Sequence, residues 1–190
     1  QPTLLVTAMS KCNINHTVTS DYKNAGDLIY LIGKNSLGLF ASELLEHFEL
    51  NSIETSFPPA IDTSINYQLY KQYHKAIKSN LIKSAHDISD GGLSVALCES
   101  MIGGDFGANI NLSMEQNNLI NLLFGEATGR FLISIDKNNK DKFEKYFSQT
   151  EIIPLGEVSD SKKLQIENSS ETVINLSLQE IKNAWSKELL

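Results

Sequence analysis

Nearly continuous apolar runs alternate with amphipathic stretches along most of the chain. The run Leu28–Ile32, which follows a turn signal at Asn24–Asp27 and is closed by Gly33, is typical of a strand buried on both faces. Further strands are predicted from β-branched or alternating apolar residues at Thr3–Met9, Ser84–Ile88, Gly107–Leu112, Phe131–Ile135, Ile152–Val158, Leu164–Glu167 and Val173–Leu176.

Apolar side chains at spacings of three and four predict amphipathic helices between these strands. A cap at Ser36 would open a helix over Leu37–Phe48 with one buried stripe, and Phe57-Pro58-Pro59 breaks the chain after it. Four more helices are expected, over Ser64–Ser79, Leu93–Ile102, Asn138–Phe147 and Leu178–Leu189. The side chains expected to anchor the second and last helices are Ile65, Leu69, Tyr73, Ala76 and Ile77, and Ile181, Ala184, Trp185 and Leu189. This order favours one α/β domain whose sheet is covered by helices.

Composition excludes several classes of protein. The 190 residues carry 16 Lys plus Arg against 23 Asp plus Glu, a net charge of −7, and Arg130 is the only arginine, so a nucleic-acid partner is not expected. No apolar run is long enough for a membrane span. The two cysteines, Cys12 and Cys98, are too few for a disulfide scaffold and suggest a reducing, cytoplasmic setting. Because position 1 is Gln, we expect the chain to be cut from a longer one.

The strongest candidate for ligand chemistry is the turn between the strand at 84–88 and the helix that follows. Ser89 or Asp90 can cap that helix, and two glycines allow positive φ and a close backbone approach. Free N–H groups at a helix start bind anions, although the charge of Asp90 opposes this. The alternative is a well-capped turn with a hydrogen-bonded histidine. The candidate phosphate- or nucleotide-binding residues here are His86, Asp87, Ser89, Asp90, Gly91 and Gly92.

Arg130 stands between a glycine turn and a strand in the run Leu123–Phe131. A single arginine in a lysine-rich set indicates a need for its planar fork, for a phosphate or for a carboxylate such as Glu126. The structural clamp with Glu126 is the favoured reading, and Arg130 is kept as a candidate phosphate ligand.

Other reactive residue types give weaker signals. His16, His47 and His74 lack metal-ligand spacing, and Cys98 is read as a small buried hydrophobe. No GxxxxGK[ST], GxGxxG or GxSxG pattern is present, so neither a catalytic residue nor a metal site is predicted.

The run His86–Leu97 resembles the H-D-x-S-D-G-G-L-x-V-A-L signature of the phosphoribosylformylglycinamidine synthase family, also called formylglycinamide ribonucleotide amidotransferase. Other landmarks follow in that family's order across the whole chain, namely Thr17–Thr19, Gly26–Gly33, Leu123–Glu126, Gly129–Phe131, Leu155–Val158 and Leu178–Trp185. The resemblance is to the last domain of the synthetase subunit, within the aminoimidazole ribonucleotide synthetase superfamily. It implies a three-layer α/β/α module with a mixed sheet, and a single domain over residues 1–190 of a longer multidomain enzyme.

The resemblance also implies the chemistry of the whole enzyme. That enzyme is an ATP- and Mg-dependent ligase that converts formylglycinamide ribonucleotide and glutamine to the amidine in purine synthesis. Its partners would be the remaining synthetase modules of the same chain, a glutaminase domain or subunit, and a small subunit. The catalytic histidine and the ATP and magnesium ligands of the family lie in other modules, so no cofactor is firmly expected in this piece. We therefore expect a supporting role, with the glycine turn lining a phosphate or nucleotide pocket at a module interface.

One stretch departs from the family pattern. Family members usually carry L-G-G-S-E where this chain has Leu37–Glu43, with the glycine pair lost and extra bulk inserted. Two alternatives therefore stay open. One is another superfamily member, such as thiamine-phosphate kinase or selenophosphate synthetase, and the other is a non-enzymatic docking or regulatory module.

Overall fold

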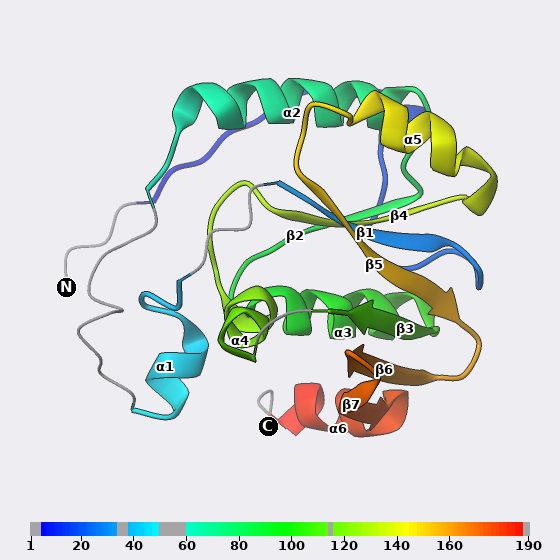
Figure 1. Cartoon of the computed structure of the whole chain (residues 1–190). Coiled ribbons are helices and arrows are strands. Elements are labelled where there is room, and N and C mark those ends of the chain that lie inside the picture. The colour runs from blue at the N-terminus through cyan, green and yellow to red at the C-terminus, as the bar shows by residue number, and fades with distance from the viewer. Residues whose placement is uncertain (1–4, 34–37, 50–59, 114–115, 188–190) are drawn as a thin grey trace.

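A mixed sheet in the strand order β2-β4-β1-β5-β3-β6-β7 runs through the protein (Figure 1). The computed structural model describes residues 5–33, 38–49, 60–113 and 116–187. Neighbouring strands are antiparallel except β3 and β6, which are parallel. The strands are β1 (Leu28–Ile32), β2 (Ser84–Asp87), β3 (Gly107–Leu112), β4 (Phe131–Ile135), β5 (Ile152–Ser159), β6 (Lys163–Asn168) and β7 (Glu171–Ser177).

Strand β1 lies between β4 and β5. Its central position explains why the run Leu28–Ile32 is almost continuously apolar. Because successive side chains of a strand point to opposite faces, Ile29 and Leu31 enter one core while Tyr30 and Ile32 enter the other. The turn before it places Gly26 at a φ of 84°, with Asp27 N–H donating to Asn24 O. The predicted turn and doubly buried strand are confirmed.

Helices cover both faces of this sheet. On one face, α2 (Thr63–Lys78) and α5 (Lys140–Tyr146), with the 3₁₀ turn η3 (Lys137–Asn139), pack over β1, β2 and β4 (Figure 1). On the other lie α3 (Gly92–Gly104), α4 (Gln116–Phe124) and α6 (Leu178–Lys187). The predicted three-layer α/β/α arrangement is confirmed, although the sequence pattern does not predict α4. Short pieces complete the described chain, α1 (Glu43–His47) and η1 (Ile14–His16).

Two predicted elements near the N-terminus are wrong in the described residues. Residues 5–9 form no strand, and Leu5, Val6 and Met9 are exposed, because no described strand lies beside them to accept their backbone hydrogen bonds. The helix expected over 37–48 shrinks to α1, and its stripe is not buried since Phe48 is exposed. Ser36, Leu37 and the 57–59 break lie outside the described residues.

Three predicted anchors are also exposed. Helix α2 buries Leu69 and Ala76 as expected, but Ile65, at its N-terminal end, is exposed. In α6, Ile181 is buried while Ala184 is exposed and Trp185 is 52% exposed, so these two expected anchors are wrong, and Leu189 lies outside the described residues.

Candidate functional site

The turn that joins β2 to α3 is shaped by two glycines. Gly91 and Gly92 have φ values of 76° and 69°, the left-handed region that glycine adopts without strain. A Cβ on Gly92 would lie 2.8 Å from the carbonyl oxygen of Leu123 and from the backbone of Phe124. The close approach expected here is thus made by the C-terminal end of α4.

Neither Ser89 nor Asp90 caps α3, so that prediction is wrong. The N-cap is Gly91, which has no side chain, and Gly92 N–H donates to Ser89 O at 3.0 Å. The Ser89 hydroxyl instead donates to Asp87 Oδ2 at 2.6 Å, and this hydrogen bond holds the pKa of the Asp87 carboxyl below its ordinary value. Asp87, Ser89 and Asp90 are all exposed at the surface of the turn.

Glu126 occupies the position that the sequence assigned to an external anion. Its Oε1 accepts from Gly91 N–H at 2.8 Å and from Glu43 N–H at 2.8 Å. A carboxylate at a helix N-terminus is stabilised by the positive end of the helix dipole. The carboxylate therefore ties the glycine turn, α1 and the loop after α4 together. The sequence predicts Glu126 only as a partner for Arg130. Its contact with the glycine turn joins two different elements, and no local sequence pattern predicts such a contact.

Arg130 is buried, with 1% of its surface exposed. Its two terminal nitrogens donate to Gly125 O at 2.8 Å and Leu122 O at 3.1 Å, carbonyls at the end of α4 that lack partners within the helix. Burial lowers its pKa to about 10, which leaves the group charged at neutral pH. The expected clamp with Glu126 is wrong, because the two terminal nitrogens donate to carbonyl oxygens, and the buried Nε has no hydrogen-bond partner among the described residues.

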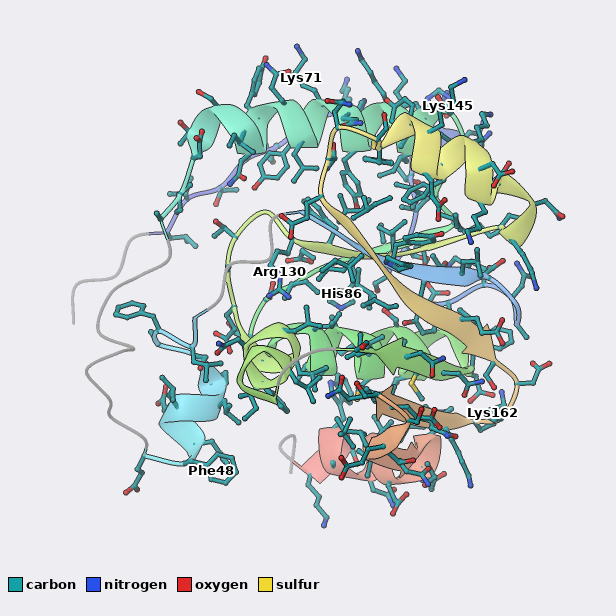
Figure 2. All side chains as sticks on the ribbon, viewed as in Figure 1. Phe48, Lys71, His86, Arg130, Lys145 and Lys162 are labelled. Atoms are coloured by element: carbon teal, nitrogen blue, oxygen red, sulfur yellow. The ribbon has the colours of Figure 1, made fainter. Side chains whose placement is uncertain are left out.

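His86 turns toward α3 instead of toward solvent (Figure 2). Its Nε2 lies 2.9 Å from Glu99 Oε2, and its Nδ1 lies 2.7 Å from Asp87 O. Both partners are hydrogen-bond acceptors. The histidine thus ties β2 to α3, as the alternative of a well-formed structural turn expects.

A cavity of about 420 Å³ opens beside the loop that follows α4, next to the N-terminal half of α2. It is lined by Ile61, Thr63, Asn66, Tyr67, Tyr70 and Thr128. Asn66 also contacts the loop backbone, since a Cβ on Gly129 would lie 2.9 Å from its Oδ1. The volume is in the range of small-molecule sites, and the uncharged, partly aromatic lining suits a planar group better than a phosphate.

The remaining candidates do not join this site. Cys98 is largely buried, which raises its pKa to about 11, and so its thiol is neutral at physiological pH. In the described part of the chain no three His, Cys, Asp or Glu residues gather as a metal site would require. None of its helices combines the length and the apolar character needed to cross a bilayer.

Comparison with known proteins gives one family and a set of similar folds. Residues 24–168 match the model of AIR synthase related protein, C-terminal domain. Thermotoga maritima PurL in complex with FGAR is similar over 88% of this chain at 18% identity, with a TM-score of 0.72, and the complex with ATP is similar over 88% at 15% identity, with a TM-score of 0.69.

The hydrogenase maturation protein of a HypE–HypF complex is similar over 82% of the chain at 19% identity, with a TM-score of 0.60. The present chain spans 30% and 27% of the two PurL chains and 53% of that third chain. At these levels of sequence identity, the similarity to solved structures shows a shared fold alone.

Proposed function

Because the chain belongs to the AIR synthase related family, whose C-terminal domain it contains, we propose that it is the C-terminal module of a PurL-like, ATP-dependent carbon–nitrogen ligase of purine biosynthesis. The whole cytoplasmic enzyme would convert formylglycinamide ribonucleotide and glutamine to the amidine with Mg-ATP. The observation that carries the proposal is the family match over residues 24–168, joined to the PurL-like fold over 88% of the chain. The same module would work beside other synthetase modules, a glutaminase and a small subunit.

Within that enzyme, this module has a supporting and ligand-lining role. The cavity on α2 holds the planar part of a nucleotide between Tyr67, Tyr70 and Ile61, all exposed residues at its rim. The exposed part of the glycine turn, Asp87 and Ser89–Gly91, lines the neighbouring surface. One observation limits this role for the turn. Gly91 N–H is already bonded to Glu126, and a phosphate at the start of α3 must therefore displace a carboxylate.

Calorimetric titration of the 190-residue chain with Mg-ATP, Mg-ADP and formylglycinamide ribonucleotide tests this role. We expect saturable heat with at least one of the three, weakened at least about fivefold by Tyr67→Ala because stacking on the ring is lost. Asp141→Ala, on the exposed side of α5, is the matched surface control and should bind as the parent does.

The pattern of loss separates the cavity from the turn. Weakening by Asp90→Ala with Gly91→Ala, and by Tyr67→Ala, supports one continuous ligand surface. Weakening by Tyr67→Ala alone assigns the ligand to the cavity. Absence of heat with all three ligands contradicts the ligand-lining role and leaves the module as a scaffold.

A further inference from the structure

The lysines of this acidic chain are concentrated in one layer of the fold. Helix α2, η3 and α5 together carry seven lysines and two carboxylates, Asp141 and Glu144, and so have a net charge of +5. The whole chain has a net charge of −7, which leaves −12 on the remainder. The seven lysines are Lys71, Lys75, Lys78, Lys137, Lys140, Lys142 and Lys145, and all are exposed.

The two helices form one continuous surface. Gln72 Nε2 donates to Tyr146 O at 2.8 Å, and Tyr146 Oη donates to Gln72 O at 3.2 Å. Lys71 and Lys145 each precede one of these residues, so they flank the seam where α2 meets α5. Figure 2 shows both on the side of the helical layer that faces away from the sheet. We call the exposed surface of Lys71, Lys75, Lys78, Lys142 and Lys145 the lysine face.

The charges of the lysine face have no carboxylate partner among the described residues, and Lys71 Nζ lies 5.1 Å from the centre of the Tyr67 ring. Among the described residues none of the seven lysines makes an ion pair, whereas Lys23, Lys83, Lys162 and Lys182 all do. The carboxylates near the lysine face either form contacts with other groups or are exposed at its edge. Glu144 accepts from the Tyr30 hydroxyl at 2.9 Å, Asp136 pairs with Lys83 at 3.1 Å, and Asp62 caps the far end of α2. Asp141 alone offers an exposed carboxylate within α5.

We propose that the lysine face is a docking surface for an acidic protein surface, a row of Asp and Glu side chains about two helical turns long. The lysines of α2 lie between Lys71 and Lys78, about 11 Å along the helix axis, which fits two turns on the acidic side of one helix of a partner. Complementary charge across an interface raises the association rate and fixes the orientation of the partners. Protein is favoured over nucleic acid because the only arginine of the chain is buried and the −12 remainder repels an extended polyanion.

Fluorescence anisotropy of a labelled helical peptide, about 20 residues long with glutamates along one side, tests the proposal. At about 20 mM salt we expect saturable binding that weakens at least tenfold near 200 mM salt, since screening shortens the reach of exposed charges. The triple variant Lys71→Glu, Lys75→Glu and Lys145→Glu should weaken binding by at least about tenfold.

The matched control reverses three lysines elsewhere, Lys163→Glu, Lys182→Glu and Lys187→Glu. These lie on β6 and α6, at the bottom of Figure 1, whereas α2 lies at the top, and they change the net charge of the chain by the same amount. We expect the control to weaken binding by less than about threefold. Circular dichroism melting curves establish that both variants are folded.

Four results would overturn the proposal. The first is an absence of binding by the parent chain, and the second is an equal loss in both triple variants, which would mean that only net charge matters. The third is tighter binding of a DNA duplex of equal charge, which would assign the lysine face to nucleic acid. The fourth is displacement of the peptide by Mg-ATP, which would assign the lysines to the neighbouring cavity.

Discussion

Arg130 is the only arginine of the chain, and its role could not be predicted from the sequence. Its fork meets two carbonyls at the end of α4, a helix that the periodicity does not predict. Since the last carbonyls of a helix lack internal partners, a buried helix end needs donors from elsewhere in the chain. The single arginine therefore stabilises the fold next to the candidate site and is itself buried.

Removal of this fork should destabilise the protein. We expect Arg130→Met to lower the free energy of unfolding by about 2–4 kcal/mol, because two buried carbonyls lose their donors. Arg130→Lys, which keeps one donor group, should lose less. Urea unfolding followed by circular dichroism measures both variants. A free energy for Arg130→Met within about 0.5 kcal/mol of the parent would show that the carbonyls find other partners.

The two cysteines should differ sharply in reactivity. Burial raises the pKa of Cys98 to about 11, whereas Cys12 is exposed in the N-terminal segment. Because the thiolate is the reactive form, iodoacetamide at pH 8 should label Cys12 first and Cys98 only slowly. Mass spectrometry of timed samples measures the two rates. Equal labelling in the native chain would show that α3 opens readily, and urea should abolish any difference.

At the scale of elements, close approaches between helices decide where glycine is required. The turn before α3 meets the end of α4 at Gly92, while Gly26 has a similar positive φ but no atom within 4 Å of its missing Cβ. The two positions thus separate backbone strain from steric overlap.

We expect Gly26→Ala to cost about 1 kcal/mol, the strain of a left-handed alanine, and Gly92→Ala to cost about 3 kcal/mol or more. The difference reports the overlap with α4. Thermal melting of both variants is the measurement. A similar cost for both would mean that α3 and α4 shift apart without loss.

The C-terminal helix gives a second matched pair. Ile181 is buried in the core beneath β6 and β7, while Trp185, one turn on, is 52% exposed. Ile181→Ala should lower the free energy of unfolding by about 2–4 kcal/mol, and Trp185→Ala by less than about 1 kcal/mol. Urea unfolding decides between them. A larger loss for Trp185→Ala would restore the tryptophan as the anchor that the sequence predicts.

At the scale of the whole molecule, charge is distributed unevenly. The lysine face lies over α2 and α5, while Asp105 joins Lys162 and Lys182 at 2.7 Å and 2.8 Å on the opposite side. Hydrogen bonds from these two lysines lower the pKa of Asp105 to about 2. Hydrogen bonds from Lys23, from the Ser89 hydroxyl and from the Asn138 N–H lower the pKa values of Asp21, Asp87 and Asp136, respectively.

These shifts predict acid sensitivity of a definite sign. A carboxyl whose pKa is lower in the folded than in the unfolded chain stabilises the fold above its ordinary pKa of 3.8, and the stabilisation is lost as pH falls toward about 2. The melting temperature should therefore fall between about pH 4 and 2. Asp105→Asn cannot titrate and should show a shallower fall in circular dichroism melts, and an equal or steeper fall would contradict the assignment.

Much of the fold follows from the sequence because it depends on local patterns. Strands β1, β3 and β4 and helices α2 and α3 were predicted close to their observed bounds, since burial on one or both faces leaves a clear period in the residues. The glycine turn was recognised by composition. Residues 5–9 were not predicted correctly because a strand is stable only with a neighbour, and no local pattern supplies one.

The contacts of the site were decided by tertiary structure. Three contacts depend on how α3, α4 and β2 pack together. They are the contacts of Glu126 with Gly91, of Arg130 with Leu122 and of His86 with Glu99. Side chains with several possible hydrogen-bond partners choose among them by proximity in space. The sequence thus determined most of the elements and the family, through periodicity and motif order. The packing of α3 against α4 determined that the N-terminus of α3 binds the chain's own carboxylate. It brings Glu126 beside the glycine turn, where Gly91 N–H donates to Glu126 Oε1 at 2.8 Å.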